Sequence, residues 1–378
     1  MFSERRFSLF KLLGFEVRID MSWIVLAVLV AWSLSTGLFP FYVKNLSTPA
    51  YWLMGIIGAV GLFLSIILHE FAHSLVARKQ GIPMRGITLF IFGGAAEMDE
   101  EPPSAKAEFL MAVVGPVSSL VLAFMFYVLQ RATASIGLSQ AVSGVLGYLA
   151  IINVILAVFN MVPAFPLDGG RILRSLLWKI KGNLKWATRV SSRIGSAFGI
   201  ILIGFGMVNL LTGGVITGLW YCLIGFFLHS AAKMSYRQLL VRRALQGEKI
   251  ERFMKRNVMT ITPSVSIEEF VDKYVYRYHH KLFPVVADTN RLIGCVTTKQ
   301  VKDIPREEWQ QKRVEDIAES CSPENSITPE TDAVEALKRM KHSRNSRLMV
   351  IREGRLEGIL VLKDLLEFLS LKADLEEE

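Results

Sequence analysis

The sequence predicts a membrane α-helical bundle of six spans with a membrane-associated β-hairpin, followed by a cytosolic α/β domain of two similar units. Three observations lead to this fold class. The mean hydropathy of +0.38 is too high for an ordinary soluble globular protein. Charged side chains are unevenly distributed, because Lys, Arg, Asp and Glu number 27 in residues 1–232 and 50 in residues 233–378. The second segment also contains an internal repeat, which predicts a duplicated unit.

Six apolar segments are long enough to cross a bilayer as helices, which takes roughly 20 residues each. Basic residues lie mainly in the loops of one side, and the other side holds only Lys44 and Arg131. By the positive-inside rule, both termini are then cytoplasmic. We therefore expect a multi-pass protein of the plasma membrane, in contact with the lipid bilayer and without a nucleic-acid partner. The predicted spans are residues 21–39, 52–76, 108–130, 144–163, 190–211 and 214–232.

The β-hairpin is expected over residues 86–98. Gly86 to Gly94 is rich in β-prone residues and too short to span as a helix. Non-helical backbone at membrane depth has to be buried in protein or line a cavity. An exposed edge here could bind an extended peptide by strand addition, and the alternative is a packed hairpin at the interface.

The second predicted span contains a cluster of ionisable side chains. His69, Glu70 and His73 are the only such residues between positions 52 and 76, and ionisable groups inside a membrane are commonly functional. Positions i and i+4 share one face of a helix, so both imidazoles can reach one metal ion. Glu70 lies beside the first histidine, where it could accept a proton from a metal-bound water. This is the HExxH pattern of zinc-dependent proteases.

A third ligand is available in Asp168, the only carboxylate between Glu108 and the soluble half. The expected topology places it on the same side of the membrane as His73. Two histidines and one carboxylate leave a fourth position open, as in catalytic zinc sites. We expect Asp168, Gly169 and Gly170 to form a turn at a helix C-terminus, with the glycines at positive φ.

Together these motifs resemble the site-2 protease family of intramembrane zinc metalloproteases, in the branch with C-terminal CBS domains. The resemblance covers nearly the whole chain. It rests on residues 69–73, on 160–170, on Gly115-Pro116 in the third span and on 89–94.

The resemblance implies one Zn²⁺ per chain, held by His69, His73 and Asp168. It implies Glu70 as general base and Asn160 as a polar group near the substrate carbonyl, although an asparagine here could instead join two helices. The implied reaction is hydrolysis of a peptide bond in, or next to, the transmembrane segment of a single-span membrane protein.

The soluble half contains the repeat. Thr262-Pro263 recurs as Thr328-Pro329, and Arg291 and Gly294 recur 64 residues later as Arg355 and Gly358. Each unit is predicted as helix, strand, turn, strand, helix, and the two resemble a tandem CBS pair. The expected domains are a transmembrane metalloprotease domain over 1–232, a linker helix over 233–250 and CBS repeats over 251–312 and 313–378.

CBS repeats that bind adenosine carry Gly-x-x-Thr/Ser-x-x-Asp. The first repeat keeps only Thr297 of the Thr and Asp positions, and the second keeps only Asp364. Binding of ATP or another adenine nucleotide at these residues therefore stays open. The alternatives for the pair are homodimerisation and substrate gating.

A different class of function is a CBS-gated transporter or channel. That function predicts ionisable groups along a path through several spans, whereas here they lie at one depth in two motifs. Three cysteines, Cys222, Cys295 and Cys321, lack metal-ligand spacing. We expect each to be a small buried apolar residue.

Overall fold

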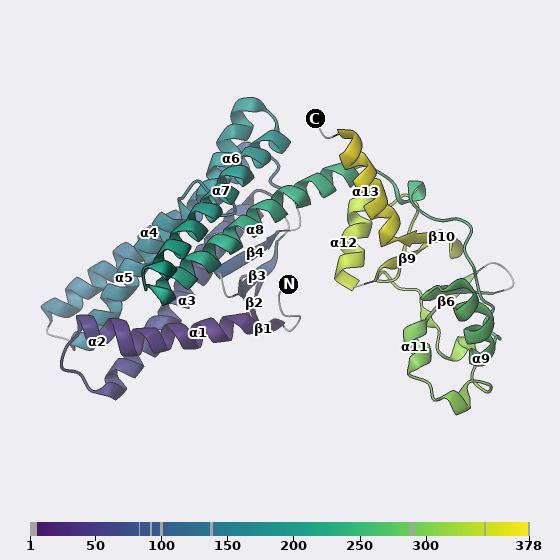
Figure 1. Cartoon of the computed structure of the whole chain (residues 1–378), viewed down its shortest axis with the longest axis horizontal. Helices are drawn as coiled ribbons and strands as arrows, with labels where there is room; N and C mark the ends of the chain where they lie inside the picture. The colour runs from purple at the N-terminus through teal and green to yellow at the C-terminus, as the bar shows by residue number, and fades with distance from the viewer. Residues whose placement is uncertain are drawn as a thin grey trace. The chain divides into compact units, whose positions relative to one another are not determined.

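The computed structural model describes residues 6–82, 84–90, 93–98, 101–136, 139–287, 291–343 and 345–376 (Figure 1). The chain divides into two compact units, Met1–Arg237 and Gln238–Glu378. The first unit is mainly helical and the second is α/β.

Six apolar helical segments of the first unit have the length and composition of membrane spans, which confirms the predicted bundle. Many of their large apolar side chains are exposed on the outside of the bundle, as expected for lipid-facing helices. The first segment is α1 (Met21–Ser33), which continues through a π-helical turn (Leu34–Leu38) into α2 (Phe39–Tyr42). The others are α3 (Thr48–Lys79), α4 (Ala105–Ser135), α5 (Gln140–Asn160), α7 (Leu184–Leu211) and α8 (Val215–Leu245).

Two helices differ from the predicted elements. Residues 233–245, expected within a separate linker helix, continue α8 without a break. An additional short helix, α6 (Asp168–Lys181), lies between the fourth and fifth spans and ends at Gly182, which has φ 65°. Because its first residue is the predicted third metal ligand, α6 decides where that carboxylate lies.

A four-stranded sheet has the order β1-β2-β3-β4. Its strands are β1 (Arg6–Leu12), β2 (Phe15–Asp20), β3 (Met84–Phe90) and β4 (Gly93–Met98). The predicted hairpin corresponds to the antiparallel pair β3 and β4, and residues 91–92 between them lie outside the described residues. The N-terminal strands were not expected, and β2 pairs with β3 in parallel.

The sheet packs against the helix that carries the HExxH pattern. Phe15 and Val17 of β2 and Ile87 of β3 are buried with Ile67 and Phe71 of α3. The rings of Phe15 and Phe71 meet edge to face with centroids 5.7 Å apart. Apolar burial thus holds the sheet against α3 at Ile67 and Phe71, two residues before and two residues after His69.

The second unit contains the two predicted repeats. The first has a helical segment over 267–278, then β5 (Leu282–Val286), β6 (Leu292–Thr297) and α11 (Thr298–Lys302). The second has α12 (Ala333–Ser343), β9 (Arg347–Arg352), β10 (Arg355–Val361) and α13 (Leu362–Glu376). Short strands β7 (Glu319–Ser320) and β8 (Ser326–Ile327) complete two three-stranded sheets. Each repeat has its own apolar core, and a smaller cluster joins them.

The cysteines differ in exposure, so the expectation that all are buried is wrong. Cys295 on β6 is buried, Cys222 is half-buried and Cys321 is exposed. Burial raises the pKa of the Cys295 thiol to about 12, because the thiolate would lose its hydration.

We expect iodoacetamide to modify Cys321 in the folded protein and to leave Cys295 unmodified near pH 8, because the thiolate is the nucleophile. An unfolded thiol ionises near pH 8.5. The neutral Cys295 therefore contributes stability that is lost as the pH rises from that value toward about 12. Peptide mass spectrometry measures the modification, with denatured protein as the control. Equal rates at both cysteines in the folded protein would contradict the assignment.

Candidate metal centre

Two buried imidazoles of α3 face one carboxylate. His69 and His73 are each 3% exposed, and Asp168 is 6% exposed. Each Nε2 atom lies 3.1 Å from the same Asp168 oxygen, Oδ2. The structure thus brings together the three predicted metal ligands, although 95 residues separate His73 from Asp168.

Helix α4 orients both rings through their other nitrogens. His73 Nδ1 lies 2.6 Å from the backbone carbonyl of Met111, and His69 Nδ1 lies 2.9 Å from the Ser119 hydroxyl. Because a carbonyl oxygen only accepts, Nδ1 of His73 carries a proton and donates it. In a neutral His73 the Nε2 lone pair then points at Asp168. Such partners on the distal nitrogen are typical of histidines that bind metals.

The rings fit against α4 because residue 115 is glycine. A Cβ atom at Gly115 would lie 2.2 Å from His73 Nε2 and 2.7 Å from His69 Nε2. Any side chain here would occupy the space of the imidazoles. Pro116 follows inside α4, where it removes one backbone hydrogen bond of the helix. The Gly115-Pro116 motif therefore shapes the wall of the site.

Asp168 is presented by the first turn of α6, so the expected turn at a helix C-terminus is wrong. Gly169 and Gly170 are helical and are absent from the residues with positive φ in the described chain. They are needed for close approach instead: a Cβ at Gly169 would lie 2.3 Å from Met161 O, and one at Gly170 would lie 2.2 Å from Phe165 N. An Asp-Gly-Gly sequence is compatible with either end of a helix, because glycine permits both a positive φ and a close approach of other atoms.

The other oxygen of Asp168 faces a cation on the same helix. Arg171 Nη1 lies 3.7 Å from Asp168 Oδ1. Its Nη2 atom is buried and has no hydrogen-bond partner in the described chain. This arginine can hold the carboxylate while Oδ2 stays directed at the histidines.

Glu70 and Asn160 have different surroundings. Glu70 follows His69 on α3 and is half-buried. Asn160 ends α5, and its Nδ2 donates to the Leu156 carbonyl of its own helix at 3.0 Å. The bond between helices comes from Asn153, whose Nδ2 donates to Ser65 Oγ on α3 at 2.9 Å.

The donor set suits zinc. Two imidazole nitrogens and one carboxylate oxygen lie within 4.8 Å of one another, and all three residues are buried. A lone pair on His73 Nε2 that faces a carboxylate oxygen is repelled unless a cation or a proton lies between them. A zinc ion would supply that attraction.

The nucleotide candidates are two different positions of the motif, Thr297 in the first repeat and Asp364 in the second. Thr297 caps α11, where its hydroxyl lies 2.9 Å from Gln300 Oε1. Asp364 is in the first turn of α13, and its Oδ1 lies 3.0 Å from Lys255 Nζ. Its Oδ2 atom is buried without a hydrogen-bond partner in the described chain.

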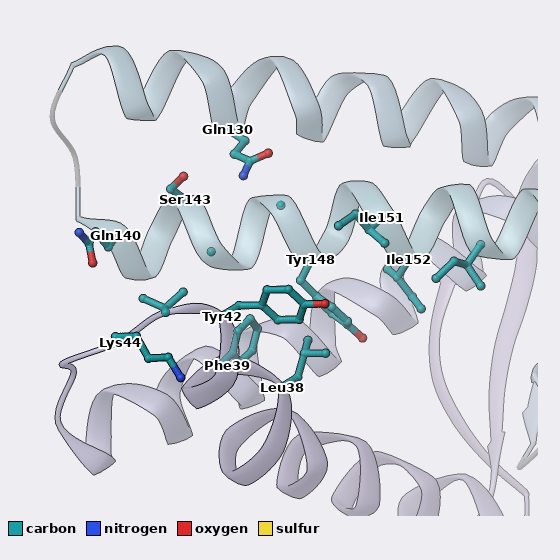
Figure 2. A pocket seen from close by; sticks show the side chains of 14 residues that line it. Leu38, Phe39, Tyr42, Lys44, Gln130, Gln140, Ser143, Tyr148, Ile151 and Ile152 are labelled. Carbon is teal, nitrogen blue, oxygen red and sulfur yellow. The ribbon is translucent and has the colours of Figure 1, made fainter. Parts of the chain in front are cut away.

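A cavity of about 600 Å³ lies in the first unit (Figure 2), and its lining does not include His69, His73 or Asp168. It is lined by residues of the α2 region, by Gln130 near the end of α4 and by α5 from Gln140 to Ile155. The imidazoles contact α4 at Met111 and Ser119 instead, at its N-terminal half.

Sequence reasoning missed the residues that orient the ligands. The signal for Ser119 was its position one turn after Gly115 on the same face of an apolar helix. The signal for Arg171 was its spacing of three residues from Asp168. The Met111 carbonyl has no signature in the sequence, because every residue carries a backbone carbonyl.

The fold and the donor set define a class: a multi-pass membrane metalloprotease with an appended pair of α/β repeats. The chain belongs to peptidase family M50, the site-2 proteases, and has tandem CBS domains. Residues 57–143 and 132–202 match the model of peptidase family M50, and residues 250–306 and 314–371 match that of the CBS domain. These matches confirm the resemblance inferred from the motifs.

Relatives that are named as zinc metalloproteases align with nearly the whole chain. Rip3 of Mycobacterium tuberculosis is 31% identical over 94% of this chain and 90% of its own. The protein sll0528 of Synechocystis is 32% identical over 96% of this chain and 95% of its own. The solved site-2 protease of Methanocaldococcus jannaschii is 27% identical, with a TM-score of 0.44, over 62% of this chain and 96% of its own. The protein is thus a zinc metalloprotease, and the transporter alternative loses its support.

Proposed function

We propose that this protein cleaves transmembrane or juxtamembrane segments of single-span membrane proteins, with zinc held by His69, His73 and Asp168. The observation that carries the proposal is the buried His–His–Asp group within a bundle of apolar helices. A buried site among membrane helices favours substrates that reach it through the bilayer. The relatives with zinc metalloprotease names support the choice of metal.

Bound zinc would polarise the scissile carbonyl and acidify the attacking water. Glu70 accepts the proton of that water and passes it to the leaving amine. Asn160 can donate a hydrogen bond to the oxyanion once its Nδ2 turns away from Leu156 O. Ser119 and the Met111 carbonyl keep both imidazoles directed inward.

The substrate is proposed to bind in extended form along the sheet. A peptide bond in a helix is protected by its hydrogen bonds and side chains, so the substrate has to unwind before hydrolysis. Strand β4 is an outer strand of the sheet, and the sheet packs on the helix with the histidines. Strand addition at this edge would hold an unwound segment near the site.

We also propose an orientation of the protein in the membrane. Basic residues favour cytoplasmic termini in the plasma membrane, and this places the His–His–Asp group near the cytoplasmic side.

Cleavage of candidate single-span peptides by the purified full-length protein, reconstituted in lipid and with its zinc content measured, tests the proposed function. The parallel sample is the Glu70→Gln variant. Absence of zinc, or equal cleavage by the variant, would reject the proposal.

For the CBS pair we propose binding of an adenine nucleotide at the second repeat. A cavity of about 200 Å³ beside this repeat is lined by residues of both repeats, among them Lys255, His280, Arg347 and Val361. Lys255 and Arg347 can bind phosphates. Asp364 is joined to this lining through Lys255, whose Nζ lies 3.0 Å from Oδ1. Its Oδ2, which has no hydrogen-bond partner in the described chain, is proposed to accept from a ribose hydroxyl. Val361 replaces the hydroxyl that such sites usually carry.

We expect saturable binding of ATP or AMP to the full-length protein by calorimetry. Asp364→Asn should weaken it by about tenfold, because a charge-assisted hydrogen bond is lost. Glu367→Gln on the exposed face of α13 is the matched control. If neither nucleotide binds, the pair is a dimerisation or gating module.

A further inference from the structure

The position of Asp168 depends on how α6 rests on α4. The imidazoles are braced by Met111 and Ser119 of α4, whereas Asp168 begins α6. The two parts of the donor group therefore keep their register only while these two helices do. Metal sites tolerate displacements of only about 0.5 Å, so a contact that fixes this register is needed.

A buried ion pair joins the same two helices. Arg174 of α6 is 6% exposed and Glu108 of α4 is 0% exposed. Both Nε and Nη2 of the guanidinium contact Glu108 Oε1. Glu108 precedes Met111 by one helical turn, and Arg174 follows Asp168 by six residues, about 9 Å along α6. The pair thus lies close to both parts of the donor group.

The guanidinium has further contacts around it. It lies over the ring of Phe165, 5.1 Å from the centroid, in the segment that leads into α6. Its Nη2 also lies 3.7 Å from Glu101 Oε2, just before α4. Arg174 of α6 therefore contacts the segment before α6, the residues just before α4 and the first turn of α4. An apolar contact would allow sliding, whereas a directed charged hydrogen bond selects one register.

We propose that Glu108 and Arg174 are positioning residues, which lock α6 to α4 and so hold Asp168 opposite the two histidines. The inference rests on the proposed role of Asp168 as a zinc ligand. Neither side chain is required to touch zinc or substrate. Their contribution is to the affinity and geometry of the metal site.

The test measures metal binding by the full-length protein in detergent micelles. Zinc affinity is determined by competition with a chelator, and the visible spectrum of the cobalt(II) form reports coordination geometry. We expect Arg174→Gln to weaken zinc by about 10- to 100-fold, as for other residues that orient ligands, and to alter the cobalt spectrum. The matched control is Arg189→Gln, which removes the bond from Arg189 Nε on α7 to the Tyr236 hydroxyl on α8. It should bind zinc as the wild type does.

A double variant removes the ambiguity of misfolding. Arg174→Gln alone leaves Glu108 buried and unpaired, whereas Glu108→Gln combined with Arg174→Gln leaves no unpaired charge. The double variant should also lose at least about tenfold in zinc affinity, with effects that do not add. Wild-type affinity and cobalt spectrum in the double variant would overturn the proposal.

The Asp168→Asn variant distinguishes a failure of the proposed zinc site from a failure of the positioning role. If this variant binds zinc like the wild type, Asp168 is not a ligand and the proposed site fails. If it loses zinc while the double variant retains it, only the positioning role of Glu108 and Arg174 fails.

Discussion

Replacement of Glu70 by Gln should reduce peptide cleavage by about 10²- to 10⁴-fold, the usual contribution of a general acid–base group. The amide has nearly the same shape as the carboxylate but cannot accept the proton of the attacking water. Glu70 lies outside the His–His–Asp donor group, so the zinc content should not change. Single-turnover cleavage of a single-span peptide measures the loss, and metal analysis of the same sample measures zinc.

The matched control for this change is Glu367→Gln. Glu367 lies on α13 of the soluble unit, where its carboxylate pairs with Lys363 and is 58% exposed. This control should cleave at the wild-type rate. Loss of zinc together with activity in Glu70→Gln would show that Glu70 holds the site together instead of transferring protons.

The second large effect is expected from Gly115→Ala, although it adds only one methyl group. The new Cβ would lie 2.2 Å from His73 Nε2, with the ring fixed on its other side by the Met111 carbonyl. Overpacking of this kind costs about 1–3 kcal/mol. Because relief of the strain moves the proposed metal-binding nitrogens, we expect zinc affinity to fall by about 5- to 150-fold. Chelator competition measures this change, and cleavage should fall in parallel.

Gly204→Ala is the corresponding control within a membrane helix. Gly204 lies in α7, and a Cβ there would have no neighbour within 4 Å. Alanine is the better helix former, so this variant should keep its zinc and its stability. If Gly115→Ala also binds zinc normally, the contact between α4 and the histidines is looser than the structure indicates.

Much of the donor group was predictable because its signals are local. The four-residue spacing of His69 and His73 sets them on one helical face, and Asp168 was the remaining carboxylate near the same membrane side. Whether a helix begins or ends at Asp168 was not predictable from the sequence. Asp168-Gly169-Gly170 fits the end or the beginning of a helix, and only the close approach to Met161 and Phe165 decides between them.

The six spans were predictable from hydropathy, but the N-terminal strands were not. Alternation of Phe15, Val17 and Ile19 indicates a strand only if a partner is known, and that partner is β3, far along the chain. The brace at Ser119 was missed for a related reason. A serine in an apolar helix usually bonds to its own backbone, and its contact with His69 depends on the packing of α3 against α4.

The parallel pairing of β2 with β3 has a consequence for how the protein is made. During synthesis, residues 15–20 leave the ribosome long before residues 84–90, with α1 and α3 between them. The N-terminal hairpin therefore has one edge unpaired until residues 84–90 have been synthesised. An unpaired edge invites wrong partners, and pairing across so long a separation is slow. Assembly of the sheet thus follows synthesis of the HExxH helix, so a chain that ends early cannot form the complete sheet without also containing that helix.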